Sequence, residues 1–185
     1  MNVDTDKIIS RFETYSKIFK KYFPCAGAER FLEDYGTRLA TCPRGLTEDD
    51  GGYHGALVEF LSNVAIRSKE ISEGVCSQKS AIRVSLVHEL GKLGSLENEL
   101  FLEQESSWHR EKLGQNFKYN DKCKRMTVSH RTLFLLQEYN IDITLDEWIS
   151  IYLSQGMHLQ EAGFYAKSRP ILSSVLEYSR SLEEA

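Results

Sequence analysis

The chain has 185 residues, of which 41% are hydrophobic and 27% are charged, so it is long enough to bury one sizeable core. A single domain over residues 1–185 is expected, and two domains are not. Lys and Arg number 23 against 27 Asp and Glu, which gives a formal net charge of −4. Because the chain is acidic and has no long run of like charges, binding of duplex nucleic acid through phosphates is not expected.

Targeting signals and cysteine spacing point to a cytoplasmic compartment. Residues 1–20 carry charges throughout and lack an apolar segment followed by a small-residue cleavage site, which argues against a secretory signal. No apolar run approaches the roughly 20 residues of a membrane-spanning helix. The cysteines form no C-x-x-C pair, which favours reduced thiols over a zinc or redox motif, with two disulfides as the alternative. They are Cys25, Cys42, Cys76 and Cys123.

The first 40 residues predict two helices. From residue 4, apolar side chains recur at spacings of three and four and form one wide stripe that ends at Pro24. A shorter helix is expected over residues 28–39. Residues 41–53 (TCPRGLTEDDGGY) contain turn formers and few apolar side chains, so they predict a loop that could rim an active site.

The middle of the chain predicts two core helices and a more irregular region. A core-facing pattern covers residues 54–72. Residues 81–93 are apolar on most of the helix circumference, which is typical of a helix in the middle of a bundle. A mixed segment over 94–105, a short serine-capped helix over 106–113 and an irregular polar stretch over 114–127 are expected to follow.

Three further helices are expected near the C-terminus. One begins at Ser129. The next begins with Thr144-Leu-Asp-Glu147, which forms a capping box, and this helix is expected to end near Gly156. The last begins at Ser168 with a proline near its first turn. Its predicted buried residues are Leu172, Val175, Leu176 and Leu182. The chain therefore predicts an all-α bundle of about seven to eight helices.

Several motifs in a fixed order resemble one enzyme family. The segment His88-Glu89-Leu-Gly-Lys92-Leu-Gly94 resembles the H-D-x-G-K-x-G signature of the HD-domain metal-dependent phosphohydrolases. Over about residues 52–182, further segments resemble phage-encoded members of that family. These segments are GALVEF from Gly55, WHREKLG from Trp108, Tyr119-Asn120, EWISIYLSQG from Glu147, and YSR from Tyr178. The resemblance implies an HD-domain-like helical fold and a gene of a tailed phage or similar virus, acting in the host cytoplasm.

The resemblance also shows that most metal ligands are missing. In that family, histidine and carboxylate side chains hold a divalent metal ion that activates water. His88 keeps one ligand, and Glu89 is a methylene longer than the aspartate it replaces. At most two protein ligands remain, fewer than the three or so of a catalytic site. The positions that have lost their ligands are Phe60, Ser154, Gln155 and Arg180, with Ser179 as the alternative to Arg180.

The leading hypothesis is therefore a catalytically degenerate HD-like protein that binds a protein partner or a nucleotide-like ligand. No metal, cofactor or catalytic residue is expected. His88 and Glu89 are expected to be a buried polar pair, bonded to each other or to Arg180, whose charge would replace that of the metal.

Two other functions stay open. One is a phosphohydrolase acting on nucleotides, with Mn, Mg, Fe or Zn held by His54, His88 and Glu89, and with Lys92 on a phosphate. In that case Asp49 and Asp50 would be further candidate ligands. The other is an oligomeric structural or virion component, in which exposed aromatic side chains form the interface of a homo-oligomer.

The remaining candidate residues favour ordinary structural roles. Trp108 is expected to anchor the core rather than to stack on a base or sugar. His130 and His158 lack metal-ligand spacing and are expected at the surface or at helix caps. The basic run over residues 118–125 (KYNDKCKR) suits an anionic partner, although Asp121 and the acidic chain weaken that case. The sequence contains no nucleophile elbow, no phosphate-binding glycine loop and no cysteine with a histidine or other general base next to it.

Overall fold

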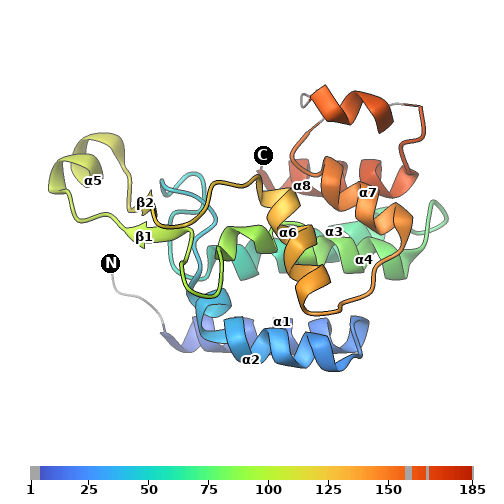
Figure 1. Ribbon diagram of the computed structural model, residues 1–185, viewed down its shortest axis with the longest axis horizontal. Helices are drawn as coiled ribbons and strands as arrows, with labels where there is room; N and C mark the ends of the chain where they lie inside the picture. The colour runs from blue at the N-terminus through green and yellow to red at the C-terminus, as the bar shows by residue number, and fades with distance from the viewer. Residues whose placement is uncertain (1–4, 157–159, 166, 185) are drawn as a thin grey trace.

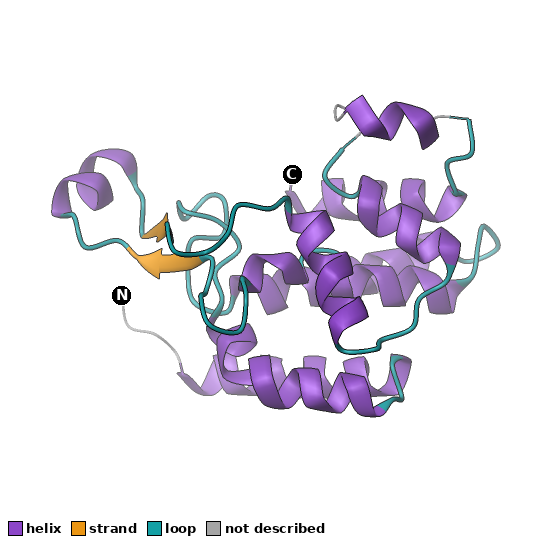
Figure 2. Cartoon of the chain, in the orientation of Figure 1, coloured by secondary structure: helices purple, strands orange, loops and turns teal. Residues whose placement is uncertain are grey.

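The computed structural model describes residues 5–156, 160–165 and 167–184. In these residues the predicted all-α bundle is confirmed, with eight α-helices, two short 3₁₀ helices and one small hairpin sheet (Figure 2). Within the same residues, no helix is long and apolar enough to cross a bilayer. The α-helices are α1 Thr5–Tyr22, α2 Ala26–Thr41, α3 Ala56–Ile71, α4 Gln78–Val87, α5 Ser107–Leu113, α6 Val128–Glu138, α7 Leu145–Leu153 and α8 Ile171–Glu184.

Helices α3 and α4 form the centre of the bundle. They pack against each other, and α8 lies against both. Helices α1 and α2 pair along one side and contact α3, as Figure 1 shows at its lower edge. The apolar stripe of α1 buries Tyr15 and Phe19, which stack on each other, and Phe19 also stacks on Phe31 of α2, so that the three rings form an aromatic row. The wide stripe recognised in the sequence is therefore the face that α1 turns to the core.

Side-chain caps begin several helices where the sequence predicts them. Ser106 accepts a hydrogen bond from the amide of His109 at the start of α5. The capping box of Thr144 and Glu147 is present at α7, with both reciprocal hydrogen bonds formed. These contacts satisfy amides that the first turn of a helix leaves unpaired.

The prediction of one helix over residues 81–93 is wrong at the C-terminal end of that range. Helix α4 stops at Val87, and a short 3₁₀ helix, η1 (Leu90–Leu93), follows. Helix α6 crosses this turn so closely that a Cβ on Gly91 would lie 2.1 Å from the carbonyl oxygen of Val128. The Gly91 amide donates to Thr132 Oγ1 at 2.8 Å. The HD-like motif therefore lies in a tight turn beneath α6 and not in the middle of a helix.

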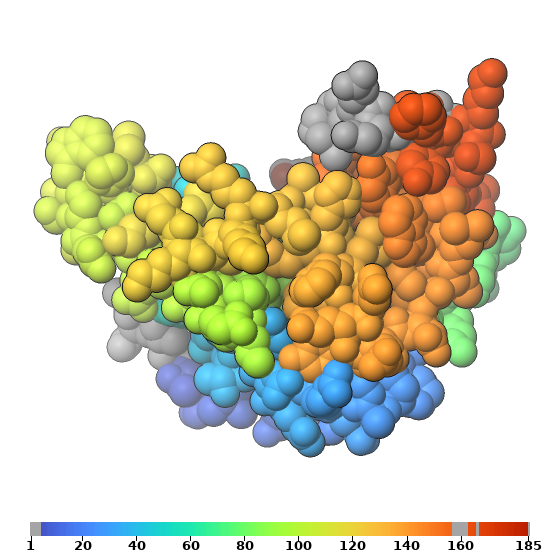
Figure 3. All heavy atoms as spheres, viewed as in Figure 1, coloured from blue at the N-terminus to red at the C-terminus, as the bar shows by residue number. Residues whose placement is uncertain are grey.

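A hairpin lobe forms within residues 94–127, and the short helix predicted over 106–113 is present there as α5. Strands β1 (Phe101–Glu103) and β2 (Phe117–Tyr119) pair antiparallel, with Phe101 opposite Tyr119, and α5 lies between them in sequence. The lobe projects to the left in Figure 1, and the outline of the molecule dips between it and the C-terminal helices (Figure 3). Since α5 has no buried residue, it contributes little to the core.

Two predicted core residues are exposed. Trp108 is 57% exposed on α5, where its ring contacts that of its neighbour His109, so the prediction that it anchors the core is wrong. Leu182 is 45% exposed near the end of α8, whereas Leu172, Val175 and Leu176 are buried as predicted.

Candidate functional site

Four chain segments converge on the turn that carries the HD-like motif. The ring of Phe60, from α3, lies 6.1 Å from that of His88, measured between ring centroids. Arg180, from α8, places Nη2 3.1 Å from Glu89 Oε1 and also donates to the carbonyl oxygen of Ser154 at the end of α7. The positions that the sequence motifs relate to metal ligands are thus brought together by the fold.

Three cations surround the carboxylate of Glu89, and we call these four residues the Glu89 cluster. Glu89 is only 1% exposed. Besides Arg180, its carboxylate contacts Arg44 Nε at 3.2 Å and Lys92 Nζ at 2.8 Å. Arg44 and Arg180 also both contact Glu184. The contact expected between Arg180 and Glu89 is present, and two further cations join it.

Charge and burial act in opposite directions on the pKa values in this cluster. Burial alone raises the pKa of Glu89, but Lys92, Arg44 and Arg180 outweigh that effect and lower it to about 2. Burial lowers the pKa of Lys92, and Glu89 opposes that change. The carboxylate is therefore ionised at neutral pH and held by fixed positive charges.

Arg44 comes from the loop that the sequence suggests as an active-site rim. Its amide donates to the Gly51 carbonyl at 2.9 Å, and Gly51 has a φ of +82°, which favours glycine. The guanidinium carbon lies 3.5 Å from the centroid of the Phe60 ring. Lys92 Nζ also donates to the Arg44 carbonyl at 2.8 Å. Phe60 thus holds a cation through its ring face.

His88 is fully buried and electrically neutral. Its Nδ1 lies 2.9 Å from the Ser85 carbonyl oxygen, so Nδ1 carries the proton and Nε2 keeps a free lone pair. Burial lowers the pKa of His88 to about 3. Among the described residues, His88 Nε2 has no hydrogen-bond partner, and neither do Ser154 Oγ and Arg180 Nε. His88 is also not bonded to Glu89, the other expectation for this pair.

The residues present do not fit a divalent metal ion. Within the described part of the chain, no group of three or more His, Cys, Asp or Glu side chains is placed to hold one. His54 is engaged elsewhere, with Nδ1 3.3 Å from the Thr41 carbonyl oxygen and Nε2 3.2 Å from Glu103 Oε1 of β1. Asp50 accepts from the Thr47 hydroxyl at 3.0 Å. The set of His54, His88 and Glu89 is therefore not assembled, and the cations beside Glu89 would repel a metal.

The remaining candidate side chains differ in how far the structure agrees with their predicted roles. Lys92 was expected on a phosphate if the chain is a phosphohydrolase, but it is an internal partner of Glu89. His130 is exposed, as expected, and its ring lies 5.2 Å from that of Tyr152. His158 lies outside the described residues. All four cysteines are free thiols.

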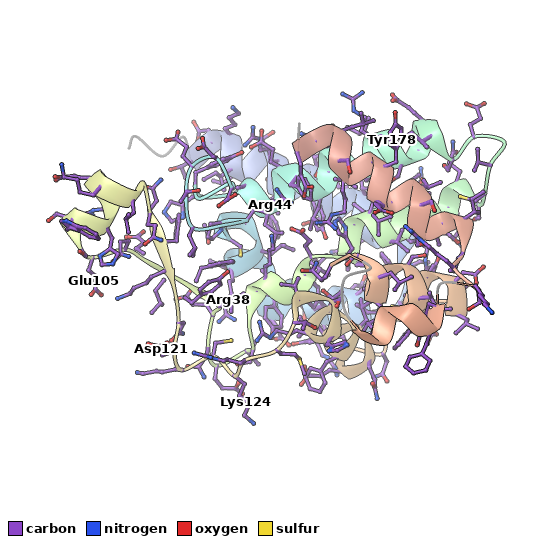
Figure 4. The ribbon with its side chains drawn as sticks, turned by 90° about the horizontal axis from the view of Figure 1, so that it is seen from above. Arg38, Arg44, Glu105, Asp121, Lys124 and Tyr178 are labelled. Carbon is purple, nitrogen blue, oxygen red and sulfur yellow. The ribbon has the colours of Figure 1, made fainter. Side chains whose placement is uncertain are left out.

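A pocket of about 720 Å³ opens beside the Glu89 cluster, and we call it the basic pocket. Its cationic lining consists of Arg44, Lys92, Lys124, Arg125 and Arg131. In Figure 4, Arg44 lies near the middle of the molecule, whereas Lys124 and Asp121 lie along one edge. The amide side chains of Asn120 and Gln155 also line it.

Sequence reasoning missed Arg44 and Arg131 as functional candidates. The contact of Lys92 with Glu89 could have been predicted, because Lys92 lies three residues after Glu89, a spacing at which opposite charges can meet on one helical face. No such signal exists for Arg44, which is 45 positions from Glu89.

Comparison with family models, curated proteins and solved structures gives no match to the chain in any of the three cases.

Proposed function

We propose that the chain is a catalytically inactive relative of the HD-domain phosphohydrolases that acts by binding a ligand or partner beside the Glu89 cluster. One observation carries the proposal: the buried carboxylate of Glu89 is held by Arg44, Lys92 and Arg180. These side chains supply the positive charge that a metal supplies in the family.

Electrostatics supports this exchange of a metal for fixed cations. A buried carboxylate needs compensating charge, and the two guanidinium groups and one ammonium group provide it. A divalent ion placed about 4 Å from any one of these cations would be opposed by about 8 kcal/mol, taking an effective dielectric constant of about 20. The cluster therefore favours a stable metal-free state.

The chemistry of the remaining polar groups also favours binding over turnover. A general base must reach the proton that it removes. His88 is fully buried, so water does not reach the free lone pair on its Nε2. Glu89 is engaged by three cations. Neither group is placed to activate a water molecule for attack on phosphorus.

A hydrolysis assay tests the proposal. Purified protein is stripped with EDTA, resupplied in turn with Mn²⁺, Mg²⁺, Fe²⁺ and Zn²⁺, and incubated with nucleoside mono- and triphosphates. We expect no phosphate release above that of buffer and no stoichiometric metal by inductively coupled plasma analysis.

The opposite result would establish the competing function. Metal-dependent phosphate release that is abolished in a folded His88→Ala variant, and retained in the matched exposed variant His130→Ala, would make the protein a phosphohydrolase with a rearranged site. In that case the proposal of an inactive binding protein is wrong.

Exposed aromatic side chains favour a second candidate, a subunit of an oligomer. Trp108 and Tyr178 are each 57% exposed, on α5 and α8 respectively. Such residues are enriched at protein interfaces. Light scattering coupled to gel filtration separates the two cases, because a monomer at micromolar concentration would exclude a stable homo-oligomer.

A further inference from the structure

The basic pocket has a surplus of positive charge that the Glu89 cluster does not share. Two of its cations, Arg44 and Lys92, contact the carboxylate of Glu89, and Arg44 also contacts Glu184. The other three form no ion pair within the described residues: Arg131, Lys124 and Arg125. Asp121 is the acidic residue that lines the pocket, and it is exposed. Among the described lining residues, these three unpaired cations and one carboxylate give the pocket an excess of at least two positive charges.

Arg131 makes this surplus energetically significant. It is only 5% exposed, and it donates to the carbonyl oxygens of Gly91, at 3.0 Å, and Lys124. Both partners are neutral, so hydrogen bonding is satisfied while the charge is not compensated. A buried charge without a counter-charge is unfavourable, and a bound anion would relieve it.

The N-terminus of α6 adds to the same field. Thr127, its N-cap, and Val128, its first residue, both line the pocket. The start of a helix carries a partial positive charge and stabilises anions near it. Arg131 lies one turn into the same helix, so the helix end and the guanidinium act from one side of the pocket.

We propose that the basic pocket binds a small phosphate compound with at least two negative charges, such as a phosphate monoester or an oligophosphate. This inference rests on the proposed function and specifies its ligand. Arginine donors match phosphate oxygens in geometry and charge. A volume of about 720 Å³ suits a small molecule. The net charge of −4 opposes the approach of a long polyanion, which favours a compact ligand over a nucleic acid.

Titration calorimetry at low salt, with EDTA present, tests this proposal using tripolyphosphate as the probe. We expect saturable binding that weakens as salt rises. The variant Lys124→Gln/Arg125→Gln removes two exposed charges without touching the core, and it should weaken binding by about tenfold or more. The matched variant Lys17→Gln/Lys20→Gln removes two exposed charges from α1 and should bind as the wild type does.

Three outcomes would overturn the proposal. They are the absence of binding to the wild type, an equal loss of affinity in the α1 variant, and binding of a single-stranded oligonucleotide lacking a terminal phosphate but not of tripolyphosphate. Failure of the proposed function is seen separately, since hydrolysis would release phosphate when metal is supplied. Tripolyphosphate recovered intact after binding in EDTA supports the pocket whatever the hydrolysis assay shows.

Discussion

The Glu89 cluster and the basic pocket share Arg44 and Lys92, but they differ in whether their positive charges are paired with carboxylates. In the cluster, each cation contacts a buried or half-exposed carboxylate, and the groups are fixed in place. In the pocket, Lys124 and Arg125 face solvent, and the partners of Arg131 in the described part of the chain are carbonyl oxygens. The difference suggests that matched charge supports the fold, whereas unmatched charge marks the place for a ligand.

The largest expected effect is that of removing the charge of Glu89. In Glu89→Gln, three neighbouring cations lose their shared counter-charge, which should destabilise the protein by about 3–5 kcal/mol at pH 7. Urea denaturation followed by circular dichroism measures it. The control Glu105→Gln breaks an exposed pair with Lys118 and should change stability by less than about 1 kcal/mol. Similar losses in the two variants would show that the cluster does not support the fold.

Removal of one cation should have a smaller effect. In Arg180→Met, Glu89 keeps Arg44 and Lys92, so the loss should be about 2–3 kcal/mol in the same denaturation assay. Arg67→Met, which removes a more exposed arginine that pairs with Glu183, is the matched control, with a loss below about 1 kcal/mol. A stability unchanged in Arg180→Met would mean that this guanidinium does not compensate the buried carboxylate.

Acid should weaken the fold through His88. Its folded pKa, about 3, lies below its ordinary value of 6.5, so the unfolded chain binds the proton first as the pH falls. The resulting loss of stability begins near pH 6.5 and amounts to about 2 kcal/mol between pH 7.5 and pH 5. Denaturation at both pH values, compared with His88→Gln, isolates this contribution.

The exposed variant His130→Gln should keep the full pH dependence of the wild type. An equal pH dependence in His88→Gln and the wild type would show that His88 is not buried in its neutral form.

The smallest effect is expected outside both regions, in the hairpin lobe. Trp108→Ala should change stability by less than about 0.5 kcal/mol, because the indole is mostly exposed and α5 buries no residue. Phe31→Ala, which removes a ring of the aromatic row from α2, should lower the free energy of unfolding by about 3–5 kcal/mol in the same urea denaturation assay. A comparable cost for Trp108→Ala would show that the lobe is part of the core.

The sequence predicts local features well because their causes are local. Helical periodicity and the capping box at Thr144 depend on residues within a few positions of each other, and both are present. The end of α4 depends instead on the close approach of α6 to Gly91, which no nearby residue signals. The pairing of β1 with β2, and with it the contact of His54 with Glu103, likewise requires segments distant in sequence to meet.

The site was predictable in part for the same reason. The resemblance to the HD-domain family predicts a fixed positive charge at Arg180, and the contact of Arg180 with Glu89 follows from complementary charge. The contribution of Arg44 depends on how the loop over residues 41–53 folds over Phe60. That geometry arises from tertiary packing and has no counterpart in local sequence pattern.

Electron paramagnetic resonance of Mn²⁺ tests the central claim most directly, because the six-line signal of the free ion diminishes on binding. Titration of EDTA-stripped protein, after removal of the chelator, should leave the signal at the intensity found in buffer, since the cations around Glu89 exclude a divalent ion. A stoichiometric loss of signal in the wild type, absent from His88→Ala, would contradict the account and show that the turn holds a metal.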